Sequence, residues 1–123
     1  MKNGFGRCAA LALAAALFAA GPAAAAAQPA PSLNPANDKL LKMSPSERSA
    51  ALAHIVGHWC IGTEAFLMGV VSAGPGRGNA YWSLRCVDAS AWAVQIDPLG
   101  EVTAIGCDIF KANGAGKECF KKF

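Results

Sequence analysis

The residues of this chain best suited to chemistry are its cysteines, because a thiol can act as a nucleophile, a metal ligand or one half of a disulfide. There are five of them, one at Cys8 and the others at Cys60, Cys86, Cys107 and Cys119. None stands in a C-x-x-C or C-x-x-C-H pattern, so their spacing indicates no thioredoxin-like redox pair, zinc knuckle or haem attachment site. We expect no cofactor.

The start of the chain indicates the compartment in which these thiols are used. Lys2 and Arg7 precede an apolar run of 13 residues at positions 8–20, and alanines fill positions 23–27. A basic start, a short apolar core and small residues before a cleavage site are typical of a secretory signal peptide. A membrane-spanning helix needs about 20 apolar residues. We therefore expect residues 1–27 to be a signal peptide, the mature chain to lack a transmembrane segment, and the protein to be periplasmic or secreted.

Removal of the signal peptide changes both the charge and the cysteine count. Residues 28–123 comprise 96 residues, enough for one small domain, with nine Lys and Arg against eight Asp and Glu, a net charge of +1. A nearly neutral domain lacks the basic surface that nucleic acid requires, so we expect no nucleic-acid partner. Four cysteines remain, and an even set in a small exported domain predicts two disulfides.

A pair of histidines is the one candidate for metal binding. His54 and His58 are four residues apart, so on a single helix both would lie on the same face, close to Cys60. Such an arrangement resembles part of a transition-metal site, and a carboxylate such as Glu47 or Glu64 would have to complete it. Because the ligand set is incomplete and Cys60 is expected in a disulfide, we expect no metal. Metal handling through the two histidines remains an alternative.

No other arrangement selects an enzyme. The sequence has no G-x-S-x-G, its eight acidic residues occur singly, and its serines and histidines show no triad spacing. The glycine-rich stretch 72–78 contains Arg77 but precedes a predicted strand, whereas a phosphate-binding loop precedes a helix. We predict a protein that is not an enzyme.

One helix has a clear start. Ser44, Pro45 and Glu47 make a capping box with proline at the first helical position. Four apolar residues after this box recur at helical spacing and form one face: Leu52, Ile55, Val56 and Trp59. We predict a helix from residue 45 to between residues 56 and 59, with Gly57 as its stop. Residues 28–43 are proline-rich and predict a disordered leader.

The remaining elements predict a sheet. Residues 65–71 form an apolar run, residues 79–87 and 91–97 alternate between apolar and polar, and residues 102–107 supply a last strand. The fold class is therefore α+β over residues 44–123, with one N-terminal amphipathic helix packed on a four-stranded antiparallel meander. The predicted core comprises Leu52, Ile55, Trp59, Phe66, Met68, Trp82, Leu84, Trp92, Val94 and Ile96. Tyr81, Arg85 and Gln95 fall on the other sheet face and form a candidate binding surface.

The strand directions favour one disulfide pairing. Cys60 precedes the first strand and Cys86 ends the second, so both fall at the same end of a meander, and Cys107 ends the fourth strand at that end. Cys60–Cys86 with Cys107–Cys119 is the favoured pairing. Cys86–Cys107 with Cys60–Cys119 is its main competitor.

The run YWSLRC, followed by AWAVQIDP, a further cysteine and CFKKF, resembles small exported proteins of Gram-negative bacteria to which no function is assigned. The resemblance spans about residues 59–123 and implies no site. In that pattern the hairpin turn usually reads Asp-Gly, whereas here Ala89 follows Asp88. A positive φ would cost alanine roughly 1 kcal/mol. The layout is also similar to that of small periplasmic inhibitors of lysozyme.

These observations predict a periplasmic or secreted disulfide-bonded module with a non-enzymatic binding or structural role. Its partner would be a protein or another envelope component. One alternative is an inhibitor of an envelope hydrolase, which needs a rigid loop that enters a cleft; residues 72–78 are the candidate for that loop. The other alternative is the metal-handling protein described above.

Overall fold

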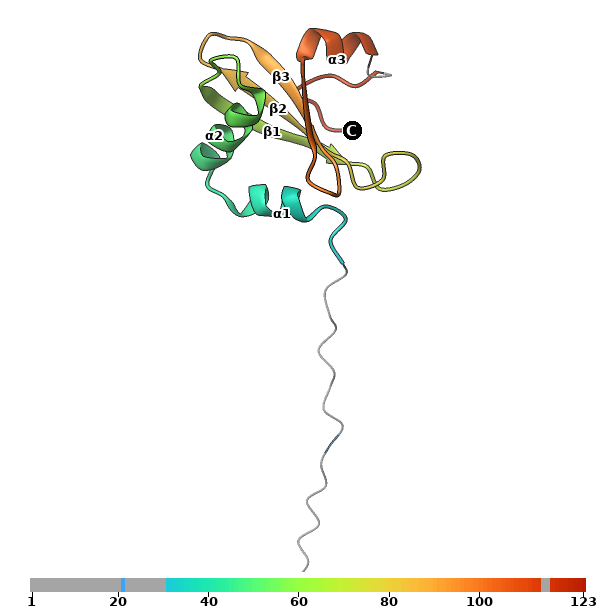
Figure 1. The fold of residues 1–123 in the computed structure, drawn as a ribbon. Coiled ribbons are helices and arrows are strands. Elements are labelled where there is room, and N and C mark those ends of the chain that lie inside the picture. Colours follow the sequence, from blue (N-terminus) through green and yellow to red (C-terminus); the bar gives the residue numbers. More distant parts are fainter. Residues whose placement is uncertain (1–20, 22–30, 114–115) are drawn as a thin grey trace, which may run out of the picture.

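The computed structural model describes residues 21, 31–113 and 116–123, so the predicted signal peptide lies outside the described residues except for Gly21. The described residues form three helices and four strands (Figure 1). In chain order these are α1 (Pro35–Lys42), α2 (Pro45–Val56), β1 (Gly62–Val70), β2 (Ala80–Cys86), β3 (Ala91–Ile96), β4 (Val102–Gly106) and α3 (Cys107–Asn113). Within the described part of the chain, no helix has the length and hydropathy that crossing a bilayer requires.

The four strands form one antiparallel meander in the order β1-β2-β3-β4. This confirms the predicted α+β class. Each strand alternates between the two faces of the sheet, so the register decides which residues share a face. Leu84 of β2 lies opposite Ala65 on one side and Trp92 on the other, and these three belong to the same face.

That face is packed against α1 and α2 and forms the main core. Trp82, Leu84 and Val94 are almost fully buried there, and Leu52 of α2 packs on them. Gly62 lets α2 approach β1 closely, since a Cβ at this position would lie 2.5 Å from the backbone carbonyl oxygen of Ser49. Met68 and Phe66, which were predicted for this core, lie on the opposite face instead.

The start of α2 is the predicted capping box. The Ser44 hydroxyl accepts from the Glu47 backbone N–H at 3.3 Å, and the Glu47 carboxylate accepts from the Ser44 backbone N–H at 2.9 Å. These hydrogen bonds to Ser44 hold the pKa of Glu47 below its usual value. The helix ends at Val56, where Gly57 adopts a φ of 64°.

The prediction of a disordered leader over residues 28–43 is wrong for residues 35–42, which form α1. Residues 28–30 lie outside the described part, but Pro35–Lys42 is helical and docks on the core through Leu40. Asn34 caps the helix by accepting from the Asn37 N–H at 2.9 Å. Its amide also donates to the carbonyl oxygens of Gly78 and Ile96, each at 2.9 Å. These buried bonds join the start of α1 to the end of the sheet at which β2 begins and β3 ends.

Two further contacts join α1 to the rest of the fold. The indole N–H of Trp82 donates to the buried side-chain oxygen of Asn37 at 2.7 Å. The Arg48 guanidinium of α2 donates to the carbonyl oxygens of Leu40 and Met43 at 2.9 and 3.0 Å. It thereby adds a second hydrogen bond to the Leu40 carbonyl, which already accepts the Met43 N–H at 3.1 Å, and binds the carbonyl of the C-cap residue Met43.

The second face of the sheet is also covered. The prediction of a single helix covered only one face. Figure 1 shows α1 and α2 at one side of the sheet, and α3 with the chain that follows it at the other. Phe110 of α3 packs on Met68 and Ala93. The Phe120 N–H donates to the hydroxyl of buried Ser83 at 2.8 Å, and the Phe123 N–H donates to the Met68 carbonyl at 3.3 Å.

Both disulfides have the favoured pairing. Cys60 is bonded to Cys86, with Cα atoms 5.3 Å apart, and Cys107 is bonded to Cys119, with Cα atoms 5.8 Å apart. The first joins the chain after α2 to the end of the central strand β2. The second joins the start of α3 to the segment that covers the second face of the sheet.

Candidate functional site

Three consecutive residues after α2 have backbone conformations with a positive φ. Gly57, His58 and Trp59 have φ values of 64°, 49° and 62°. This region is open to glycine but costs L-residues roughly 1–2 kcal/mol each. The next residue closes the loop, since the Cys60 N–H donates to the Gly57 carbonyl at 2.9 Å and Cys60 is bonded to Cys86. The strained segment is therefore anchored at both ends.

The indole of Trp59 is the most exposed large hydrophobic group among the described residues. Its relative exposure is 100%, so the prediction that Trp59 belongs to the core is wrong. The helical spacing that suggested burial ends at Val56, because Gly57 turns the chain away from the helix axis. Ile61 and Val87 are also exposed and lie side by side, with the Val87 N–H donating to the Ile61 carbonyl at 2.9 Å.

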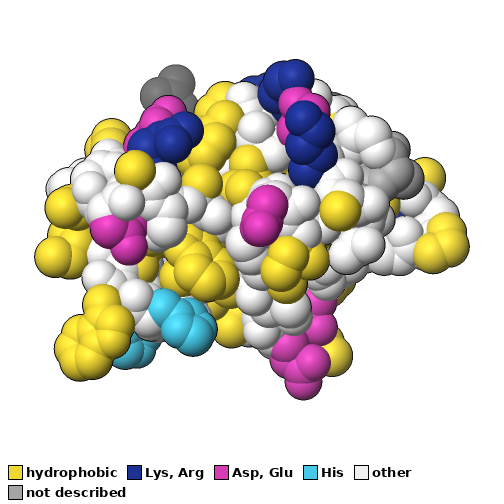
Figure 2. All heavy atoms as spheres, turned by 90° about the horizontal axis from the view of Figure 1, so that it is seen from above, with side chains coloured by type: hydrophobic (Ala, Val, Ile, Leu, Met, Phe, Trp, Pro, Cys, Tyr) yellow, Lys and Arg dark blue, Asp and Glu magenta, His cyan; other side chains and the backbone are white. Residues whose placement is uncertain are grey.

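A shallow hollow of about 440 Å³ lies next to this loop. It is lined by Ala50, Ala53, His54, Gly57, Trp59, Cys60, Ile61 and Gly62. Residues 49–63 contain no Lys, Arg, Asp or Glu. Trp59 and the hollow thus form a surface without formal charge, which we call the Trp59 surface. Figure 2 shows the two histidines at one end of the molecule beside a projecting hydrophobic side chain.

The histidines do not share a helix face as predicted. His54 lies on α2 and lines the hollow, whereas His58 lies beyond the end of the helix. The His58 ring stacks on Trp92, with ring centroids 5.4 Å apart and planes within 5°. The sulfur of Cys60 is used in the disulfide, and no three His, Cys, Asp or Glu side chains of the described residues come together. The geometry lends no support to a metal site.

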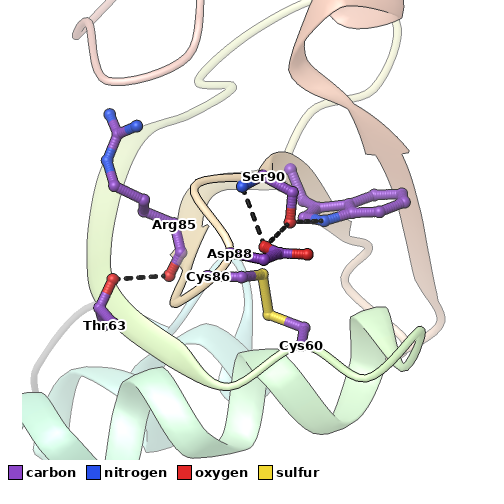
Figure 3. Close-up of a disulfide and its surroundings, with 7 residues drawn as sticks. Cys60, Thr63, Arg85, Cys86, Asp88 and Ser90 are labelled. Atoms are coloured by element: carbon purple, nitrogen blue, oxygen red, sulfur yellow. Dashed lines mark hydrogen bonds between the residues drawn. A yellow bond between two sulfur atoms is a disulfide. The ribbon is translucent and has the colours of Figure 1, made fainter.

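Hydrogen bonds around the first disulfide hold Trp92 in place (Figure 3). The Trp92 indole N–H donates to the Ser90 hydroxyl at 3.2 Å, and this hydroxyl donates to the Asp88 carboxylate at 2.6 Å. The Ser90 backbone N–H donates to the same carboxylate at 3.0 Å. The Ser90 hydroxyl, followed by that N–H, holds the pKa of Asp88 below its usual value. The loop that carries Trp59 is therefore held against the Trp92 ring through the stacked ring of His58.

The predicted binding surface of Tyr81, Arg85 and Gln95 is divided by the last part of the chain. Tyr81 and Gln95 are directly opposite each other on β2 and β3. Ser83, between Tyr81 and Arg85 on this face, is fully buried and accepts the Phe120 N–H. Arg85 lies beyond that crossing, 3.4 Å from the Glu64 carboxylate and with its guanidinium 4.5 Å from the Phe120 ring centroid. Tyr81 and Gln95 line one hollow, to which Arg85 does not contribute.

Comparisons with family models, with curated proteins and with solved structures returned no match. The resemblance to small exported proteins of Gram-negative bacteria stays a prediction.

Proposed function

We propose that this protein is an exported, non-enzymatic binding module that contacts a partner protein through the Trp59 surface. The observation that carries the proposal is the complete exposure of Trp59 on a loop closed by a disulfide. Tryptophan is enriched among the residues that dominate protein interfaces, and burying an indole in a partner removes a large apolar area from water.

The rigidity of the loop supports this role. A loop whose backbone is already held in its binding position loses less conformational freedom when it binds. Here Cys60 is bonded to β2 and His58 is stacked on Trp92, so both neighbours of Trp59 are fixed. A flexible loop with an exposed indole would lose part of the gain from burial.

The partner follows from the chemistry of this surface. A projecting indole requires a recess, and the absence of Lys, Arg, Asp and Glu from residues 49–63 matches the charge-poor centre of a protein interface. An anionic membrane surface would instead favour lysine or arginine beside the indole. We therefore infer an apolar recess on a protein as the target.

The test is capture of partners from envelope extract by the oxidised protein, with Trp59→Ala in parallel. Leu99→Ala is the matched control, because Leu99 is 89% exposed in the turn between β3 and β4. We expect Trp59→Ala to lose the captured protein and Leu99→Ala to retain it. Equal capture by all three proteins would refute the role of Trp59.

An inhibitor of an envelope hydrolase is the second candidate, and the same loop favours it. The predicted inhibitory stretch 72–78 contains Gly74, Gly76 and Gly78 at positive φ, and residues 72–77 are exposed. The anchored loop at Trp59 meets the requirement for a rigid projection better. Inhibition of a lysozyme by the unmodified protein and not by Trp59→Ala would support this candidate, whereas inhibition by both would place the contact elsewhere.

A further inference from the structure

A second hollow lies on the opposite face of the sheet from α2, between β2, β3, β4 and the chain from α3 onward. Its volume is about 330 Å³, within the lower part of the range of small-molecule sites. It is lined by Tyr81, Ala93, Gln95, Thr103, Ile105, Phe110, Asn113 and Lys117. It shares no lining residue with the hollow beside Trp59, so it is a separate candidate site.

The lining combines an apolar floor with a polar rim. Ala93 and Phe110 are buried, and Ile105 packs against them. Gln95 and Thr103 are directly opposite each other on β3 and β4, and both contribute to the rim. An amide and a hydroxyl can each donate a hydrogen bond to a ligand whose body rests on the floor.

Lys117 is the charged member of this lining. Its ammonium lies 5.3 Å from the Tyr81 ring centroid and 4.4 Å from the Phe123 ring centroid. Ring faces attract a cation and hold it in position, but they do not neutralise its charge. Among the described residues, the nearby carboxylate of Glu118 is engaged by Lys111 and Lys121, and no Asp or Glu lines the hollow.

We propose that this hollow binds a small molecule with a flat apolar body and a carboxylate group. The body packs on Tyr81, Ile105 and Phe110. The carboxylate pairs with the Lys117 ammonium and accepts hydrogen bonds from Gln95 and Thr103. A charged hydrogen bond is stronger than a neutral one, and a partly buried ammonium is screened less by salt than a fully exposed one. The site therefore prefers an anion to an uncharged molecule of the same shape.

The probe is 3-phenylpropionate, titrated into the oxidised protein and followed by the backbone amide signals in NMR spectra. Its amide, 3-phenylpropanamide, and the cation 3-phenylpropylamine are matched in shape and differ in charge. We expect saturable shifts at Tyr81, Gln95 and Thr103 with the carboxylate, an affinity about tenfold weaker for the amide, and weaker still for the amine. An equal affinity for all three, or shifts confined to other residues, would overturn the proposal.

Variants of Lys117 test whether its ammonium group binds the carboxylate. Lys117→Gln should weaken 3-phenylpropionate binding about tenfold, while Lys117→Arg should largely retain it. Lys122→Gln, at an exposed lysine that does not line the hollow, should bind as the unmodified protein does. Trp59→Ala should also bind normally, so loss of either proposed site can be recognised independently. If Lys117→Gln proves unstable, Thr103→Val gives a second test at an exposed residue, and unchanged binding in both would refute the assignment.

Discussion

Replacing Cys60 and Cys86 together by alanine tests whether this disulfide is structural. The bond spans 26 positions of the sequence, and in the chain-entropy model such a loop adds about 3.5 kcal/mol to the free energy of unfolding. For a domain of this size that corresponds to a fall in Tm of roughly 14–28 °C. Because small domains have a total stability of about 5–15 kcal/mol, the variant should fold but unfold at clearly lower urea concentration.

The second disulfide supplies a matched control. Cys107 and Cys119 are 12 positions apart, and the same model gives about 3 kcal/mol for their loop. The two double variants should therefore lose similar stability. Only the Cys60→Ala/Cys86→Ala protein should release the loop that carries Trp59, so only this variant should lose partner capture at a temperature where both are folded.

Two results would refute this reasoning. A loss of less than about 1 kcal/mol in urea unfolding would show that the bond does not restrain the unfolded chain as the loop model requires. Reaction of Cys86 with a thiol reagent in the native, unmodified protein would show that it is not bonded to Cys60. Its 2% exposure predicts slow reaction even after reduction, so mapping of unreduced peptides is the decisive measurement.

Three further changes test other parts of the fold. Ala89→Gly should raise the free energy of unfolding by about 0.5–1 kcal/mol, measured in urea, because Ala89 has a φ of 67° and glycine removes a steric cost larger than the entropy it adds. Gly62→Ala should lower it by about 1–3 kcal/mol, since the new Cβ meets the backbone carbonyl of Ser49; unchanged stability would contradict the close packing of α2 on β1. Lys111, followed by Lys121, lowers the pKa of Glu118 to about 2 from 4.5. The folded state then binds fewer protons than the unfolded chain, so this stabilisation is complete above pH 4.5 and is lost as the pH falls toward about 2. Glu118→Gln should accordingly have a lower free energy of unfolding in urea than the unmodified protein at neutral pH, and the two values should converge in acid.

Local signals predicted the sheet and the disulfides well. Alternation over residues 79–97 identified the central hairpin, and the strand directions of a meander brought Cys60 and Cys86 to one end. The left-handed conformation of Ala89 is the one that an Asp-Gly turn would favour. These features depend on neighbouring residues and on strand order, which the sequence displays directly.

The predictions for α1 and Trp59 were wrong because the signal of a single residue was given less weight than the pattern around it. Asn34 and Pro35 form the same cap-and-proline signal as Ser44 and Pro45, but the surrounding prolines favoured a disordered leader. Trp59 matched the helical spacing, yet Gly57 ends the helix before it. The placement of Lys117 over the Tyr81 ring could not be predicted, because it requires the last part of the chain to fold back over the second face of the sheet.

Each disulfide supports one of the two proposed contact surfaces. Cys60 directly follows Trp59 and joins its loop to β2, whereas Cys107 and Cys119 enclose α3 and the segment that carries Lys117. Reduction would therefore release both surfaces at once, and binding would be restricted to an oxidising compartment, in keeping with the predicted export. The single-disulfide variants should separate the two activities, with partner capture depending on Cys60–Cys86 and 3-phenylpropionate binding depending on Cys107–Cys119. Loss of both activities in either variant would show instead that each disulfide acts only through the stability of the whole domain.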